Sequence, residues 1–133
     1  MKKKHVIFLS VLILIIGATF TIVVVKSNIE ANLEKLESLV VSDVDLTKVS
    51  DGIYTGRYSA FPVAAEVKVT VEGHKITGIE LVKHDNGQGK PAEVIPAKVV
   101  KAQSLNVDIV SGATYSSKVI LKAIEDALNN PNK

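Results

Sequence analysis

Ala65-Glu66-Val67-Lys68-Val69-Thr70-Val71-Glu72 alternates apolar and polar side chains along its whole length. A period of two places every second side chain on the same face of a β-strand, so this stretch predicts a strand with one buried face. Gly73-His74 follows and predicts a tight turn with a solvated histidine, because glycine tolerates positive φ. The chain then returns as Ile76 to Lys83, whose alternation slips at Thr77-Gly78 and predicts a β-bulge there.

Further elements on either side extend this hairpin into a small domain. Upstream, Ile53 to Phe61 predicts another strand, which Pro62 ends. Downstream, Pro96 suits the first turn of a short helix, and residues 116–129 predict a final helix with apolar side chains on one face. Strands that precede helices predict an α+β fold, in which a small antiparallel sheet carries helices packed on one face.

An apolar segment, Val6 to Val25, precedes this domain and contains no charged residue. About twenty apolar residues suffice for a helix to cross the hydrocarbon core of a bilayer. Residues 2–5 are basic, whereas the flank beyond Lys26 carries glutamates, so the positive-inside rule predicts a single-pass membrane protein with a cytoplasmic N-terminus and an extracytoplasmic domain. A cleaved signal peptide is the alternative, although residues 23–27 make a poor cleavage site.

The sequence therefore divides into four expected segments. They are a basic cytoplasmic tail (1–5), a transmembrane helix (6–25), a helical stalk (26–50) and a soluble domain (51–130). Apolar residues of the stalk follow helical spacing: Ile29, Leu33, Leu36 and Val40. Such a face either forms a dimeric coiled coil or docks on the chain's own domain. The pattern is shorter than a coiled coil requires, so docking is the preferred interpretation.

Composition excludes several classes of function. The chain has no cysteine, so disulfides, thiolate metal sites, iron–sulfur ligation by thiolate and lipidation at cysteine are all excluded. Basic and acidic residues are nearly balanced from Asp51 onward, and aromatic residues make up 5% of the chain. Because nucleic-acid binding needs a basic surface and stacking aromatics, we expect no nucleic-acid partner.

Small and hydroxyl-bearing residues crowd one junction, Asp108-Ile109-Val110-Ser111-Gly112-Ala113-Thr114-Tyr115-Ser116-Ser117. It joins an extended, strand-like segment to the final helix. Free backbone N–H groups and the positive end of a helix dipole favour an anion at such a place, above all a phosphate. A phosphate ester on the Thr114 hydroxyl is sterically and electrostatically reasonable. The alternative is a plain loop that ends in an N-cap.

The same ten residues resemble the flavinylation motif of the FMN-binding domain family, which includes subunits of the Na⁺-translocating NADH:quinone reductase and of the related ferredoxin-oxidising complex. The resemblance covers roughly Asp51 to Asn129. It implies FMN held through a phosphoester on Thr114, formed by a flavin transferase with FAD as donor. The implied role is electron transfer between membrane or extracytoplasmic redox partners. The soluble part lacks long insertions, which favours a stand-alone, membrane-anchored carrier over a subunit of a larger pump.

On this interpretation seven residues form the cofactor site, and none is catalytic or a metal ligand. Glycine and alanine keep bulk away from the acceptor, and the serine hydroxyls donate hydrogen bonds to phosphate oxygens. The aspartate is repelled by phosphate, so it either holds the loop by accepting backbone N–H bonds or is recognised by the transferase. The set is Thr114 as covalent acceptor with Asp108, Ser111, Gly112, Ala113, Ser116 and Ser117.

Rival functions have less support from the sequence. An exported binding module without a cofactor is the main alternative. A serine hydrolase is disfavoured, because Ile109 and Ala113 stand where the nucleophile elbow around Ser111 needs glycine. The loop from His84 to Lys90 has two glycines that permit close approach to a ligand, and an ordinary flexible loop is the alternative. A proton relay or metal site at His84-Asp85 is less expected than an incidental pair.

Overall fold

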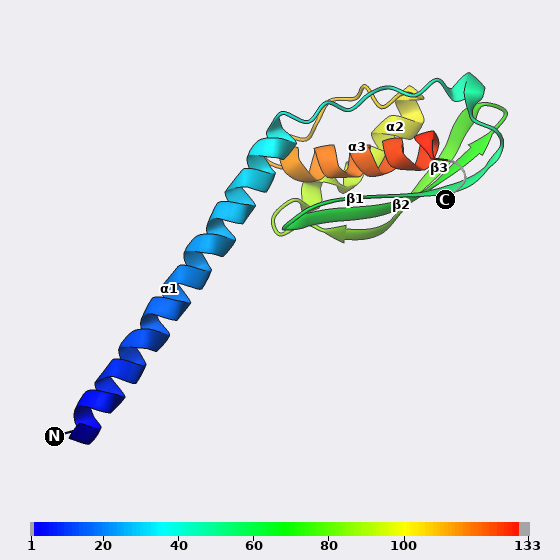
Figure 1. Ribbon diagram of the computed structural model, residues 1–133. Coiled ribbons are helices and arrows are strands. Elements are labelled where there is room, and N and C mark those ends of the chain that lie inside the picture. The colour runs from blue at the N-terminus through cyan, green and yellow to red at the C-terminus, as the bar shows by residue number, and fades with distance from the viewer. Residues whose placement is uncertain (1, 131–133) are drawn as a thin grey trace. The chain divides into compact units, whose positions relative to one another are not determined.

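The computed structural model describes residues 2–130. It contains two compact units, one N-terminal to Leu33 and one from Leu33 onward. Figure 1 shows the elements in chain order: α1 (Lys2–Glu37), a 3₁₀ turn (Leu46–Lys48), β1 (Gly52–Ala60), β2 (Val63–Glu72), β3 (Lys75–Asp85), a second 3₁₀ turn (Lys90–Val94), α2 (Ile95–Ala102) and α3 (Thr114–Asn129).

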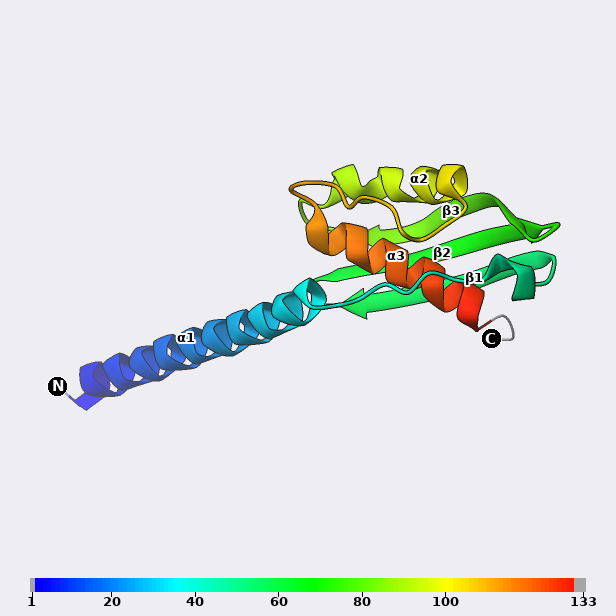
Figure 2. The same ribbon diagram turned by 90° about the horizontal axis from the view of Figure 1, so that it is seen from above.

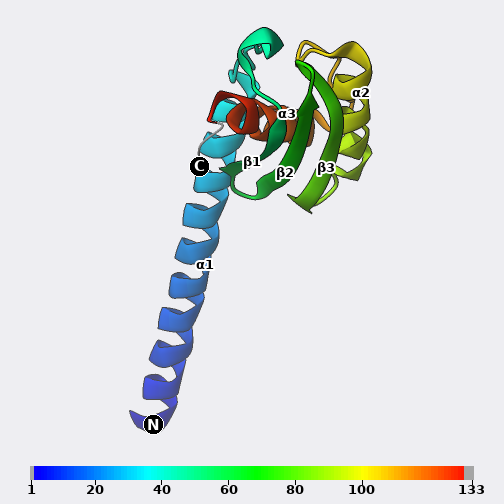
Figure 3. The same cartoon turned by 90° about the vertical axis from the view of Figure 1, so that its right-hand side faces the viewer.

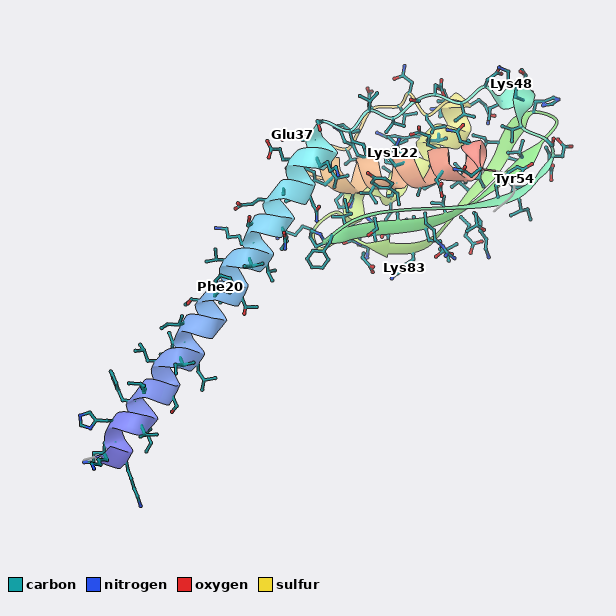
Figure 4. The ribbon with its side chains drawn as sticks, viewed as in Figure 1. Phe20, Glu37, Lys48, Tyr54, Lys83 and Lys122 are labelled. Atoms are coloured by element: carbon teal, nitrogen blue, oxygen red, sulfur yellow. The ribbon has the colours of Figure 1, made fainter. Side chains whose placement is uncertain are left out.

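The helix α1 is 36 residues long and begins with the apolar segment. Its large apolar side chains are exposed from Val6 to Val25, and Phe20 is 70% exposed (Figure 4). Within residues 2–130 this is the one helix long and apolar enough to cross a membrane. By its length and composition this helix could span a bilayer.

The predicted helical stalk is longer than the helix that the structure contains. α1 ends at Glu37, and the chain continues without helix to the short turn at Leu46. Beyond Glu37 the burial alternates, because Leu39 and Val41 pack on the core while Val40 is 75% exposed. A period of two is typical of extended backbone. The predicted docking of one helical face is found only in part: Leu33 and Leu36 of α1 pack on the core of the second unit, whereas Val40 does not.

The sheet is a three-stranded antiparallel meander in the order β1-β2-β3. Alternation along β2 is confirmed, since every second residue from Val63 to Val71 is buried. The bulge is also confirmed, because Thr70 pairs with Gly78 and Val71 with Ile76, which leaves Thr77 between them. A second irregularity lies at Glu66/Val67, and no pattern in the sequence predicts it.

The turn between β2 and β3 is confirmed, and its histidine, which was predicted to be solvated, also contacts the backbone before β1. Gly73 and His74 both have positive φ, at 57° and 60°. The His74 Nδ1 atom lies 3.2 Å from the carbonyl oxygens of Leu46 and Val49. Asp51 accepts a 2.8 Å hydrogen bond from the Gly73 N–H. The turn therefore fastens the segment that leads into β1.

Both helices of the domain pack on one face of the sheet, which confirms the predicted α+β fold. α3 crosses β1 and β2, and α2 packs on β3 (Figures 2 and 3). The closest approach is at Gly56, where a Cβ atom would overlap the Ala123 carbonyl and the Ala127 N–H of α3. The opposite face of the sheet is open to water, and Lys83 points away from the helices there (Figure 4).

The predicted strand-like segment before α3, residues 106–110, is irregular and belongs to no strand of the described chain. Instead, Asp43 holds its start by accepting hydrogen bonds from the Ser104 hydroxyl at 2.6 Å and the Leu105 N–H at 2.9 Å. The Ser104 bond is the main reason that the pKa of Asp43 lies below its ordinary value, with further lowering from the Leu105 and Val44 N–H groups. The segment therefore reaches α3 as an anchored loop.

Candidate functional site

A tight turn leads into α3 and leaves its first backbone groups open. Gly112 has φ of +80°, and the Ala113 N–H bonds back to the Val110 carbonyl at 3.0 Å. Ala113 is the N-cap and makes no side-chain capping bond. The helix begins at Thr114, two residues earlier than the pattern predicted. The proposed acceptor is therefore the first helical residue and not part of the preceding loop.

Three backbone N–H groups at the start of α3 have no hydrogen-bond acceptor within residues 2–130, so they are open to a ligand. The first backbone bond of the helix runs from the Ser117 N–H to the Ala113 carbonyl at 2.9 Å. Within residues 2–130, the N–H groups of Thr114, Tyr115 and Ser116 find no hydrogen-bond acceptor. Unpaired N–H groups and the helix dipole together favour an anion at this end.

A cleft of about 520 Å³ opens over this helix end. Its size is in the range of pockets that hold small molecules and cofactors, roughly 300–1,000 Å³. Four segments of the second unit line it: the last turn of α1, the start of β2, the loop after β3 and the start of α3. The lining residues are Leu33, Glu37, Pro62, Val63, Asn86, Gly87, Gln88, Gly89, Gly112, Ala113, Thr114, Tyr115 and Ser116.

Four of the seven residues predicted from the sequence line this cleft, namely Gly112, Ala113, Thr114 and Ser116. Ser116 is 2% exposed, and its hydroxyl has no hydrogen-bond partner in the described part of the chain. Thr114 is half-buried, and its hydroxyl is likewise unpaired within residues 2–130. Two hydroxyls that could serve a bound phosphate therefore lie where the N–H groups are open.

The other three predicted residues do not line the cleft. Ser117 is fully buried and its Oγ accepts a 3.0 Å hydrogen bond from the Val110 N–H, so it fastens the entry to the helix. Ser111 is exposed in the turn. Asp108 is exposed, and within residues 2–130 its carboxylate accepts no backbone N–H bond. The predicted loop-holding role of Asp108 is therefore absent from this structure, and only its main-chain carbonyl is bonded, to Lys98 Nζ at 3.2 Å.

The loop after β3 contributes a close contact with the helix end. A Cβ atom on Gly89 would overlap the Ser116 side chain. Only a residue without a side chain lets the loop lie this near to α3. The two glycines in this loop were the sequence signal for a ligand nearby. In contrast, Leu33 and Glu37 carry no local signal of a binding role, because they approach from a distant part of the sequence.

His84 lies beneath this loop and pairs with a residue other than its sequence neighbour. Its Nδ1 is 3.1 Å from Glu93 Oε1, and its side chain is 3% exposed. Asp85 instead pairs with Lys83 at 3.1 Å. The His84 Nε2 atom is buried and has no hydrogen-bond partner in the described part of the chain. Residues 2–130 contain no cluster of three His, Cys, Asp or Glu that could hold a metal.

Residues 62–129, just over half of the chain, match the model of the FMN-binding domain. The chain belongs to the FMN-binding domain family. The match contains the start of β2, the loop after β3 and the start of α3, which are three of the four walls of the cleft. A flavin-binding role in electron transfer follows from membership of this family.

Curated relatives of this FMN-binding domain include much longer proteins. An uncharacterized protein of Treponema pallidum (strain Nichols) is 30% identical over 87 residues, covering 63% of this chain and 24% of the relative. NADH:acrylate oxidoreductase of Vibrio harveyi is 34% identical over 85 residues, covering 62% of this chain and 8% of the relative. Urocanate reductase of Eggerthella lenta is 39% identical over 66 residues, covering 47% of this chain and 11% of the relative. The chain thus spans a quarter or less of each relative's length.

The cleft fits the cofactor of the family. Its volume suits a small-molecule cofactor, and its lining combines apolar residues with a few polar groups, as cofactor pockets do. The unpaired N–H groups of Thr114, Tyr115 and Ser116 suit the phosphate. Gly87 is exposed at the cleft, so the backbone there is open to a ligand.

Proposed function

We propose that this protein is a membrane-anchored, extracytoplasmic electron carrier that holds FMN covalently through a phosphoester on Thr114. One observation carries the proposal: an unpaired threonine hydroxyl begins a helix, beside three unpaired N–H groups, in a cleft large enough for a flavin. Membership of the FMN-binding domain family supports the identity of the cofactor. The alternative is an exported binding module without a cofactor, and it does not account for this arrangement of unpaired groups.

Attachment is a phosphoryl-group transfer at the threonine oxygen. Thr114 Oγ forms a bond to the flavin-side phosphorus of FAD, and the bond from that phosphorus to the bridging pyrophosphate oxygen breaks. AMP leaves with the bonding electron pair, and the hydroxyl proton is released to a base of the flavin transferase. No electrons are gained or lost by the protein in this step.

The chain's own residues then bind and orient the product. The N–H groups at the start of α3 and the Ser116 hydroxyl are placed to donate to the phosphate oxygens, in the field of the helix dipole. The loop at residues 86–89 and the Tyr115 side chain border the space that remains for the rings. When bound, the flavin supplies one- and two-electron redox chemistry, and the protein supplies attachment and orientation.

The apolar part of α1 supports the proposed membrane anchor. Its exposed apolar side chains and sufficient length support a single crossing of the bilayer. The basic residues 2–5 favour a cytoplasmic N-terminus, so the domain lies outside the cytoplasm. Covalent attachment suits that location, because a dissociated cofactor would be lost there. The redox partners are then membrane-bound or extracytoplasmic.

Flavin fluorescence in a denaturing gel tests covalent attachment. The full chain is produced with a flavin transferase, beside Thr114→Ala and Thr114→Ser. We expect a fluorescent wild-type band and a dark Thr114→Ala band of equal protein staining. Thr114→Ser keeps a hydroxyl at the same place and should retain part of the fluorescence. A dark band from folded wild type, despite an active transferase, would sink the proposal and favour the cofactor-free binding module.

Asp108 has a separate expected role in recognition by the transferase. Its carboxylate is exposed and free of protein contacts in the described residues, which suits a group that a partner binds. We expect Asp108→Ala to leave the thermal unfolding midpoint unchanged and to prevent the fluorescent band. Normal flavin loading of this variant would contradict the role.

A further inference from the structure

The last turn of α1 forms one wall of the cleft over Thr114. Leu33 and Glu37 line the cleft together with the start of α3. Figure 4 shows Glu37 at the C-terminal end of α1. Both residues belong to the second compact unit, which begins at Leu33. The matched FMN-binding domain begins only at residue 62, so this wall comes from a part of the chain that the family model does not cover.

This turn is fastened to the domain by packing and by hydrogen bonds. Leu36 is 1% exposed and belongs to the hydrophobic core. Lys118, one helical turn after Thr114, donates from Nζ to the main-chain carbonyl of Glu37. Asp43 ties the following segment to Leu105 and its neighbour. Because the turn is held from both sides, it is a fixed wall of the cleft in this structure.

We propose that the last turn of α1 is a cofactor-binding element, in which Leu33 shields the bound flavin from water and Glu37 sets a negative charge at its edge. The proposal rests on FMN occupying this cleft. A leucine side chain excludes water from the surface it covers. A carboxylate that borders the cleft repels the negative charge that a flavin gains on reduction, and it therefore lowers the reduction potential.

Acrylamide quenching of flavin fluorescence tests the shielding by Leu33. The full chain is loaded with flavin and studied in detergent micelles, as wild type, Leu33→Ala and Leu39→Ala. Leu39 is a matched control, because it is also a half-buried leucine packed on the core but does not line the cleft. We expect the quenching constant to rise in Leu33→Ala and to stay at the wild-type value in Leu39→Ala. An equal constant in all three proteins, or an equal rise in both variants, would overturn the proposal.

A redox titration tests the charge of Glu37 with a variant that keeps the packing. Glu37→Gln is compared with Glu72→Gln, which makes the same change of charge on an exposed residue at the far end of β2. The nine steps along the strand from the cleft-lining Val63 to Glu72 extend for about 30 Å. We expect the flavin midpoint potential to rise in Glu37→Gln and to stay unchanged in Glu72→Gln. No difference between these variants would overturn the charge role.

The two possible failures are distinguishable. If the wild-type chain carries no flavin in a denaturing gel or in solution, the proposed function fails and this inference falls with it. If the flavin is present and neither Leu33 nor Glu37 changes its quenching or its potential, the inference alone fails. Circular dichroism of each variant checks that the domain is folded.

Discussion

The two ends of α3 are built for different purposes. Towards its C-terminal end, polar side chains are paired within the protein: Asp126 accepts the Arg57 N–H at 3.0 Å, and Lys122 pairs with Glu125 at 2.6 Å. At its N-terminal end, Ala113 makes no capping bond, and three N–H groups have no acceptor within residues 2–130. One end of the same helix therefore supplies stability, while the other keeps hydrogen-bonding capacity for a ligand.

The largest expected effect comes from a change that disrupts the packing of the C-terminal half of α3 on the sheet. Gly56→Ala adds a methyl group that would overlap the backbone of α3 at Ala123 and Ala127. Overpacking of this kind destabilises a protein by about 2–3 kcal/mol. Gly78→Ala is the matched control, because no atom lies within 4 Å of its added Cβ. Urea unfolding measures both, and equal stabilities for the two variants would contradict the packing role of Gly56.

A smaller effect on stability, but a direct effect on the site, is expected at the N-terminal end. Gly89→Ala would overlap the Ser116 side chain and push the loop away from the cleft. The loop is at the surface and has room to shift, so we expect less destabilisation than in Gly56→Ala, together with weaker flavin loading. Gly87 cannot serve as a control, because its φ of +54° strains any side chain.

Relief of the overlap sharpens this comparison. Adding Ser116→Gly to Gly89→Ala removes the side chain that the new methyl group meets. We expect flavin loading to recover in part, at a cost of about 1 kcal/mol for glycine inside a helix. In-gel fluorescence measures loading, and urea unfolding measures stability. Ser116→Gly alone is the control for loss of the hydroxyl that faces the phosphate. Lower loading in the double variant than in Ser116→Gly alone would show that the overlap with Ser116 is not what weakens loading.

The smallest expected effect concerns the carboxylate that anchors the segment before α3. The pKa of Asp43 is lower in the folded protein than its ordinary value of 3.8. Its contribution to stability is therefore complete above pH 3.8 and is lost as the pH falls through the folded pKa. Asp43→Asn should lower the unfolding free energy at pH 7, and the difference from wild type should shrink below pH 3.8. A difference that is the same at pH 7 and pH 3 would contradict this role.

The sheet could be predicted because its pattern is local. Alternation from Ala65 to Glu72 and the slip at Thr77-Gly78 are visible in a few consecutive residues, and both are confirmed. The end of α1 could not be placed, because Leu33, Leu36 and Val40 continue a helical spacing past the true end at Glu37. The competing signal, the alternation around Val40, spans only three residues.

The residue types of the site could be predicted from the sequence, but the directions in which their side chains point could not. Ser116 and Ser117 are equivalent in the sequence, yet consecutive helical side chains point about 100° apart. One lines the cleft, and the other bonds the Val110 N–H. Leu33 and Glu37 were missed as cleft residues, because only tertiary packing brings them to Thr114.

The short connection between the apolar segment and the folded unit limits how far the domain could lie from a bilayer that the segment crosses, as proposed above. Seven residues, 26–32, lie between Val25 and Leu33. Even fully extended, they reach at most about 25 Å. With the apolar segment in a bilayer, the domain explores a thin layer over the membrane, and encounters with a membrane-bound partner become a two-dimensional search.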